Sequence, residues 1–224
     1  MRQPHLEHSG YYIREIQAPE HPIVLSGGDL SAEMLLEAYQ KGFFPWPEKE
    51  DELNWWFTVP RMILKPDQFI RSKSLRQSLR NKGFRVTFDR AFTEVIEACA
   101  NTPRKGEPGT WIFKAIRDSY IRLHRLGYAH SVETWHKGRL VGGLYGVSLG
   151  KAFFGESMFY IERDASKVAL SHLIDRLLEW RFFMIDCQMY TGHLARMGAR
   201  LISGREYLDL LHSSLNFPTL RGKW

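Results

Sequence analysis

The chain has 224 residues, of which 44% are hydrophobic and 25% charged, and its formal net charge is +6. This is the composition of an ordinary globular protein, and no apolar run approaches the ~20 residues that cross a bilayer, so we expect no membrane partner. The N-terminal residues contain no apolar core of a secretory signal. Cys99 and Cys187 have no metal-binding spacing, which predicts a cytoplasmic protein without structural disulfides.

The first predicted element is a helix that begins after Asp29 or Ser31, either of which can be its N-cap. The acidic loop and the prolines that follow this helix end at a Pro-containing passage around 57–62, which is the best candidate for a domain boundary. We therefore expect a small N-terminal domain over 1–60 and a second domain over 61–224.

The next segment is strongly basic, with nine Lys and Arg residues against two acidic ones between Arg61 and Arg90. It contains a predicted helix over 73–82 and a predicted strand over 84–88. Such a run is either a solvated face or a surface that binds nucleic acid through its phosphates. Composition alone leaves both interpretations open.

The rest of the chain predicts an α+β fold around a mixed sheet. Two amphipathic helices, the second capped by Thr110 and ended by Gly127, precede three extended segments joined by short turns, which predicts an antiparallel meander. A further helix then leads to a strand that would return parallel to the meander. The predicted ranges are 89–100, 110–127, 129–136, 139–148, 151–160, 165–181 and 183–190, with a last helix over 205–211.

Three polar residues occur in strand-like apolar surroundings and are candidates for chemistry. Glu156 lies in "FFGESMFY", and Asp186 and Gln188 lie in "FMIDCQMY". Because they are two positions apart, Asp186 and Gln188 would leave the same face of a strand. Alternatively, Arg163 or Lys167 neutralises Glu156, and Asp186 merely ends a strand.

Two tryptophans, Trp46 in "FFPWP" and Trp111 in "GTWI", stand beside Gly or Pro, where large rings are often partly exposed. They are either core residues or a stacking clamp for a nucleic-acid base. His130 could be a general base, although a structural role at a strand start is favoured. The sequence contains no P-loop, no dinucleotide-binding glycine pattern and no zinc spacing.

Taken in order, several strings strongly resemble the bacterial leucyl/phenylalanyl-tRNA–protein transferases over about residues 25–210. They are "GGDLSAEMLLEAYQKGFFPW", "WWFTVPRMIL", "GTWI", "LHRLGYAHSVE", "LVGGLYGV", "FFGESMF", "ASKVAL" and "DCQ". The resemblance assigns no role to the tail, "FPTLRGKW".

The resemblance implies a small N-terminal α/β domain followed by a domain like the GNAT N-acyltransferases. It implies an enzyme that moves Leu or Phe, and less readily Met, from aminoacyl-tRNA to the α-amine of proteins that begin with Lys or Arg. The product would be marked for N-end-rule degradation. No metal or other cofactor is implied, and the exposed site of the family suits a monomer.

The resemblance also assigns roles to residues of this chain. It matches Asp186 and Gln188 with the catalytic pair of the family, and Glu156 with a glutamate of its site. The substrate-binding residues expected are Trp46 and Trp111 for the 3′-terminal adenosine, Met158, Leu170 and Phe154 for the amino-acid side chain, and Lys73, Arg76 and Arg80 for tRNA phosphates.

In such a site the Gln188 carbonyl would aim the incoming amine, while Asp186 accepts a hydrogen bond from the Gln188 amide. Either Asp186 or the ribose 2′-hydroxyl takes the proton. The basic side chain of the acceptor requires an acidic partner, for which Glu156 and the loop over 48–52 are candidates.

Two rival functions remain. A CoA-dependent N-acyltransferase would need a pyrophosphate-binding turn between a strand and a helix, and the nearest string, "HRLGYA", is a poor match. A non-enzymatic RNA-binding module would use the basic run and the tryptophans but would leave Glu156, Asp186 and Gln188 unexplained.

Overall fold

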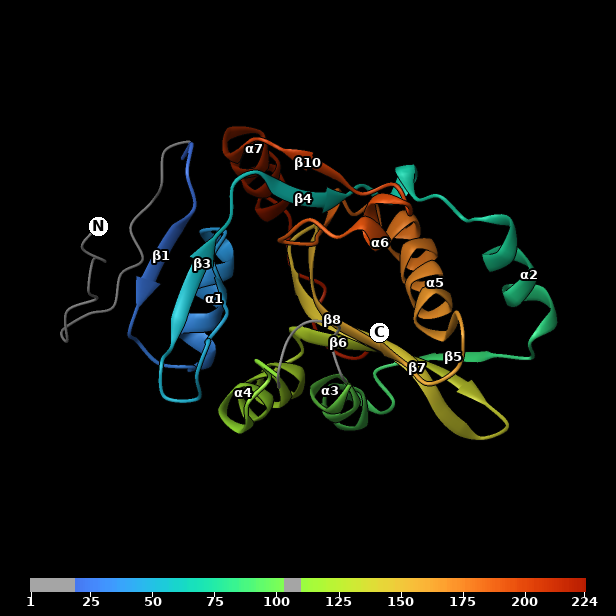
Figure 1. Ribbon diagram of the computed structural model, residues 1–224. Coiled ribbons are helices and arrows are strands. Elements are labelled where there is room, and N and C mark those ends of the chain that lie inside the picture. Colours follow the sequence, from blue (N-terminus) through green and yellow to red (C-terminus); the bar gives the residue numbers. More distant parts are fainter. Residues whose placement is uncertain (1–18, 103–109) are drawn as a thin grey trace.

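The computed structural model describes residues 19–102 and 110–224, which form two sheets and the helices around them (Figure 1). The smaller sheet has the strand order β1-β3-β2, and the larger one β10-β4-β9-β8-β7-β6-β5. The strands are β1 (Ile23–Ser26), β2 (Phe44–Pro45), β3 (Asn54–Phe57), β4 (Arg61–Leu64), β5 (Arg85–Phe88), β6 (Ala129–His136), β7 (Arg139–Leu149), β8 (Ala152–Tyr160), β9 (Met184–Asp186) and β10 (Arg200–Ile202).

The larger sheet is mixed, because β8 and β9 pair parallel, whereas every other pair of neighbouring strands in this sheet is antiparallel. Strands β6, β7 and β8 form the predicted meander. The long helix between β8 and β9 returns the chain to the edge of the sheet at which β8 begins, so that β9 can run parallel to β8. The predicted α+β class with a mixed sheet is therefore confirmed.

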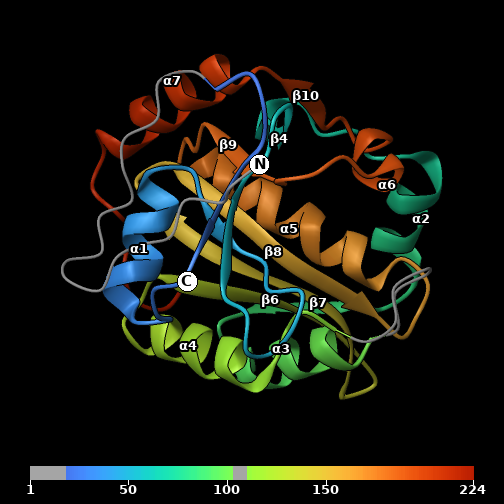
Figure 2. The same ribbon diagram turned by 60° about the vertical axis from the view of Figure 1, so that its left-hand side comes forward.

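Helices cover both faces of the larger sheet (Figures 1 and 2). The helices are α1 (Ala32–Gln40), η1 (Pro66–Gln68, a 3₁₀ turn), α2 (Lys73–Asn81), α3 (Phe92–Asn101), α4 (Lys114–Arg125), α5 (Ala165–Glu179), α6 (Gly192–Ala195) and α7 (Gly204–Leu215). Alternate residues of β7 explain this arrangement: Tyr145 and Val147 join the core beneath α3 and α4, whereas Leu144 joins the core beneath α5.

At the start of α1, the two candidate N-cap residues, Asp29 and Ser31, have different roles. The Ser31 hydroxyl accepts a hydrogen bond from the Met34 amide at 3.2 Å, so Ser31 is the N-cap. The Asp29 carboxylate instead accepts from the Ser31 amide at 2.8 Å and holds the cap residue in place.

Two elements are much shorter than predicted. Helix α4 begins at Lys114 rather than after Thr110, because the Thr110 hydroxyl accepts from the Ile112 amide at 3.1 Å in a local turn. Strand β9 ends at Asp186 instead of continuing to residue 190, because Gln188 has a positive φ of 55°.

The change from one sheet to the other falls between Phe57 and Arg61, within the passage expected to be a boundary. One hydrophobic core nevertheless contains residues of both sheets, including Trp55, Phe57 and Ile63. The division into two separate domains therefore stays a prediction. Within the described ranges, the structure contains no helix long and apolar enough to span a membrane.

Candidate active site

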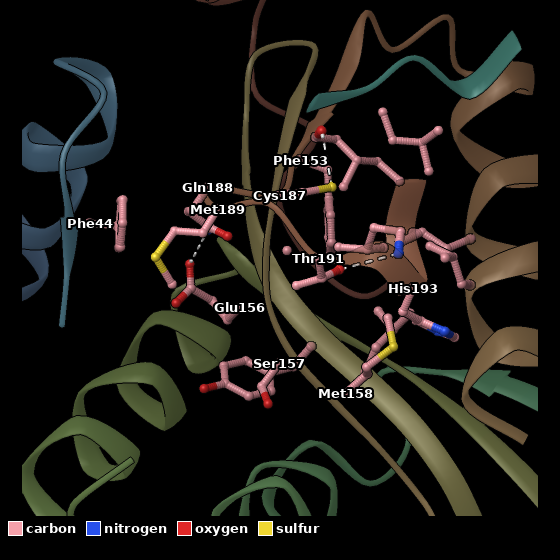
Figure 3. A pocket seen from close by; sticks show the side chains of 18 of the residues that line it. Phe44, Phe153, Glu156, Ser157, Met158, Cys187, Gln188, Met189, Thr191 and His193 are labelled. Atoms are coloured by element: carbon pink, nitrogen blue, oxygen red, sulfur yellow. Dashed lines mark hydrogen bonds between the residues drawn. The ribbon is translucent and has the colours of Figure 1, made fainter. Parts of the chain in front are cut away.

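A cavity of about 390 Å³ opens between the smaller sheet and the α5 face of the larger one (Figure 3). One part of its wall is aromatic and comes from Phe44, Trp46 and Trp111. Glu156 and Gln188 also line the cavity. The remaining wall is mainly apolar, and its residues include Leu64, Leu144, Phe153, Met158, Leu170, Leu173, Ile185 and Leu194.

Glu156 enters this cavity because strand β8 contains a bulge. Tyr145 pairs with Ser157 and Gly146 pairs with Gly155, so Glu156 is an extra residue that has no partner on β7. A bulge of this kind bends the strand and re-aims the side chains around it. The unpaired position supplies the carboxylate without interrupting the buried strand.

The bulge also corrects the expectation for Phe154. Without it, Phe154 and Met158 would share a face of β8, but the extra residue reverses the alternation between them. Phe154 is fully buried on the opposite face, with its ring 4.8 Å from that of Tyr39. Phe153 lines the cavity in its place, together with Met158 and Leu170.

The partners of Glu156 are neutral side chains rather than the cations considered from the sequence. The Tyr39 hydroxyl donates to Oε1 at 2.7 Å, and the Tyr120 hydroxyl donates to Oε2 at 2.9 Å. The Gln188 amide Nε2 donates to Oε1 at 3.4 Å (Figure 3). Lys167, one of the predicted cations, pairs with Asp164 instead.

The two tyrosine hydroxyls also contact each other, which closes a ring of three oxygen–oxygen contacts with the carboxyl group. When Glu156 is ionised, both phenol protons are given to its oxygens. When Glu156 is protonated, its own proton can take the place of one of these two bonds, and the tyrosine that is released can donate to the other hydroxyl. The geometry therefore fits a carboxyl group that can hold a proton.

The pKa of Glu156 is raised to about 7. Burial is the main cause and Asp186 adds to it, while the hydrogen bonds from Tyr39 and Tyr120 and the charge of Arg61 oppose it. A carboxyl group with a pKa near 7 can both accept and return a proton at neutral pH. Perturbed groups of this kind in a cleft are typical of active sites.

Asp186 is not part of the cavity wall. Its carboxylate is completely buried in a bidentate ion pair with Arg61, at 2.9 Å to Nε and 2.7 Å to Nη2. The Tyr207 hydroxyl donates a further hydrogen bond at 2.8 Å. These donors occupy the carboxylate, and the rings of Phe44, Phe57 and Tyr207 surround the guanidinium.

The expected bond between the Asp186 carboxylate and the Gln188 side chain is absent. Asp186 Oδ1 instead accepts from the Gln188 backbone amide at 2.9 Å. The Met189 amide donates to the Cys187 carbonyl at 2.6 Å, and the Thr58 hydroxyl donates to the Gln188 carbonyl at 2.9 Å. This tight turn, with its positive φ at Gln188, directs the side-chain amide to Glu156 rather than to Asp186.

The other predicted residues lie outside the cavity lining. Lys73, Arg76 and Arg80 are exposed on α2, outside the cavity lining. His130 is buried, with Nδ1 2.8 Å from the Asp89 carboxylate, as a structural histidine would be. Within the described parts of the chain, no three His, Cys, Asp or Glu side chains gather as they would around a metal ion.

Sequence reasoning missed several residues that shape the site. In the apolar periodicity of α1 and α4, Tyr39 and Tyr120 look like ordinary core positions, although a buried tyrosine hydroxyl usually needs a partner. Arg61 was counted with the exposed basic run, yet it is completely buried. The partnership of Arg61 with Asp186 spans 125 positions, and no local pattern encodes it.

Comparison with known proteins identifies the family. Residues 63–212 match the family described as "Leucyl/phenylalanyl-tRNA protein transferase", and residues 28–58 match the N-terminal domain described for it. The transferase of that name from Syntrophus aciditrophicus (strain SB) is 52% identical over 207 residues, 92% of this chain and 87% of its own. The chain belongs to the leucyl/phenylalanyl-tRNA protein transferase family. The predicted class of enzyme, an aminoacyltransferase, is thereby confirmed.

Further relatives agree with this assignment. The leucyl/phenylalanyl-tRNA–protein transferase of Syntrophobacter fumaroxidans (strain DSM 10017 / MPOB) is 55% identical over 189 residues, 84% of this chain and 81% of its own. Among solved structures, a GCN5-related N-acetyltransferase from Kribbella flavida covers 81% of this chain and 65% of its own, with 8% identity and a TM-score of 0.40. Because this TM-score is below 0.5, the solved structure carries no argument about the fold. The description of the fold rests on the strand order of this chain itself.

Proposed function

We propose that this protein transfers Leu or Phe, and less readily Met, from aminoacyl-tRNA to the α-amine of proteins that begin with Lys or Arg. The transferred residue would mark those proteins for N-end-rule degradation. The observation that carries the proposal is that Glu156 and Gln188 line the same cavity as several aromatic residues and a larger set of apolar ones. Such an arrangement suits an adenosine on one side, an aminoacyl side chain on the other and the ester between them.

The apolar wall supports selection of hydrophobic amino acids. Burial of each CH₂ group contributes about 0.8 kcal/mol, whereas a polar side chain would lose its hydration there. Met158 can adapt its shape, which allows the same wall to accept both a branched and an aromatic side chain. Leu170 and Phe153 are almost completely buried and supply firmer surfaces.

The aromatic wall supports binding of the terminal adenosine. Trp46 and Trp111 are both partly exposed and line the cavity. A base stacked on an aromatic ring gains about 1–3 kcal/mol. We assign these tryptophans to the 3′ end of the tRNA, and the phosphates of the acceptor stem to Lys73, Arg76 and Arg80 on α2.

In the transfer step, the acceptor nitrogen forms a bond to the ester carbonyl carbon while the bond to the ribose 3′-oxygen breaks. One proton must leave the nitrogen and one must reach the 3′-oxygen. Glu156 can accept the first and return it to the leaving oxygen, with Gln188 orienting the amine. Asp186 contributes by fixing the turn that presents Gln188, and its ion pair with Arg61 leaves it unsuited to take the proton.

The direct test mixes the protein with leucyl-tRNA and a peptide that begins with Arg, and detects the leucyl adduct by mass. A peptide that begins with Asp is the matched acceptor control. No adduct with the Arg peptide, under conditions where another family member is active, would contradict the proposal. A tRNA ending in 2′-deoxyadenosine distinguishes proton transfer through Glu156 from proton transfer through the ribose 2′-hydroxyl. If transfer is retained with this tRNA, the 2′-hydroxyl is not required.

The rival CoA-dependent reaction has less support. The string "HRLGYA" runs from the last turn of α4 into β6, the reverse of the required strand-to-helix order, and Gly127 ends the helix with a φ of 80°. Acetyl-CoA should therefore leave the melting temperature unchanged. The cytoplasmic location and the monomeric state stay predictions.

A further inference from the structure

The segment 216–224, for which the family resemblance offers no role, is fastened to the larger sheet at several points. The Gly150 amide donates to the Thr219 hydroxyl at 2.9 Å, and the Gly222 amide donates to the Gly127 carbonyl at 3.3 Å. The Arg221 guanidinium donates to the Leu126 carbonyl at 2.9 Å. These contacts lead the segment across the ends of neighbouring elements and bring Trp224 against the core that contains α5.

Trp224 is held in one position by contacts on several sides. Its ring stacks on His130, with the ring centres 3.9 Å apart, and meets Trp180 edge-on at 5.0 Å. Its backbone amide donates to the Asp89 carboxylate at 2.9 Å, the same carboxylate that holds His130. The indole N–H donates to the Leu220 carbonyl at 3.3 Å.

The Trp224 ring also supports the cavity wall. Its centre lies 5.7 Å from the ring of Phe153, which lines the cavity. The end of the Phe153 ring rests on Gly146, where an added Cβ would lie 2.6 Å from ring atoms. The backbone at Gly146 and the Trp224 ring thus restrict where Phe153 can move.

We propose that Trp224 is a positioning residue that sets the size of the amino-acid side of the cavity through Phe153. It thereby governs the relative use of Leu and Phe as transferred residues. This inference rests on the proposed function. Without the indole, Phe153 can retreat into the vacated space, the cavity enlarges and the larger aromatic substrate gains relative to Leu.

The test compares Trp224→Ala with the unchanged protein, using kcat/KM for phenylalanyl-tRNA and leucyl-tRNA. The expected result is a rise of about three- to tenfold in the Phe/Leu ratio, below the effect of a directly altered pocket contact. Trp224→Phe should restore most of the original ratio. Phe217→Ala, which removes an exposed ring of the same segment, should leave the ratio unchanged.

A double-mutant cycle distinguishes positioning from general loss of stability. Phe153→Leu should raise the Phe/Leu ratio by itself, and Trp224→Ala should then add little, because its effect passes through the Phe153 ring. If Trp224→Ala does not fold, Trp224→Leu is used in the same cycle. An unchanged ratio in a folded Trp224 variant, or full additivity with Phe153→Leu, would overturn the inference. Absence of transfer by the unchanged protein would instead contradict the proposed function.

Discussion

Gln188 combines a strained backbone with a side chain in the middle of the cavity. Its φ of 55° is unfavourable for a residue with a Cβ, by about 1–2 kcal/mol. We predict that Gln188→Gly and Gln188→Ala lose transfer to a similar extent, since both lack the amide. Gln188→Gly should nevertheless be about 1 kcal/mol more stable in urea unfolding, because only glycine relieves the strain. Equal stability of the two variants would argue against strain at this turn.

Glu156 predicts a pH dependence of transfer. Because its pKa is about 7, the carboxylate that we propose as acceptor of the amine proton becomes available as pH rises through this value. Single-turnover transfer should therefore increase through about pH 7. Glu156→Gln should lower the rate by about 10²–10⁴-fold, the usual contribution of a positioned acid–base group. A Glu156→Gln variant with the original rate and pH profile would remove Glu156 from the chemistry.

The same carboxyl group predicts an opposite trend in stability. Its folded pKa is raised above the ordinary value of 4.5, so the folded state binds more protons than the unfolded state between these two values. The stability that this provides is present below pH 4.5 and is lost as pH rises through about 7. The difference in Tm, Glu156→Gln minus the unchanged protein, should thus be more positive at pH 8 than at pH 4.5. An equal difference at both pH values would contradict this.

At the scale of elements, strand β8 itself was predictable from the sequence, but its bulge was not. Apolar patterning and turn residues predicted the meander, and the odd carboxylate in "FFGESMFY" marked a residue that lines the cavity. The bulge was not predictable, because it depends on how β7 pairs with β8 and not on β8 alone. That single inserted residue decides that Phe153 rather than Phe154 lines the cavity.

Helix α2 carries the prediction for tRNA binding. Lys73, Arg76 and Arg80 are exposed, and Leu75 and Ser78 form its buried side. Replacing Arg76 and Arg80 with Ala should reduce the slope of log affinity against log salt by about two, close to one per lost phosphate contact. Arg205→Ala, at an exposed position of α7, provides a control on a different helix. An unchanged slope in the double variant would exclude these contacts.

At the scale of the whole molecule, Arg61 joins parts of the chain that lie far apart in sequence. It is the first residue of β4, and sequence reasoning placed it on a basic surface because its neighbours are exposed cations. Its burial follows from long-range pairing: β4 lies between β9 and β10, which come from the last part of the chain. The class of fold was predictable from local patterns, whereas this partnership depends on tertiary packing.

Removing the Arg61 charge should therefore destabilise the protein strongly. Arg61→Met leaves the Asp186 carboxylate buried without a cation, which typically costs about 3–5 kcal/mol. Arg71→Met, in a more exposed pair with Asp175, should cost less than about 1 kcal/mol. Urea unfolding measures both variants. Addition of Asp186→Leu to Arg61→Met should restore much of the loss, and failure to do so would argue against an isolated charge as the cause.

Tyr207 lies beyond every residue that lines the cavity, since the lining residues run from Phe44 to Leu194. Its hydroxyl nevertheless binds both Asp186 and Arg61 from helix α7. A growing polypeptide that has emerged only as far as α6 thus has all the side chains of the cavity but not the helix that braces the Gln188 turn. In the order of synthesis, the contacts of Tyr207 with Asp186 and Arg61 can therefore form only after every residue that lines the cavity has been made.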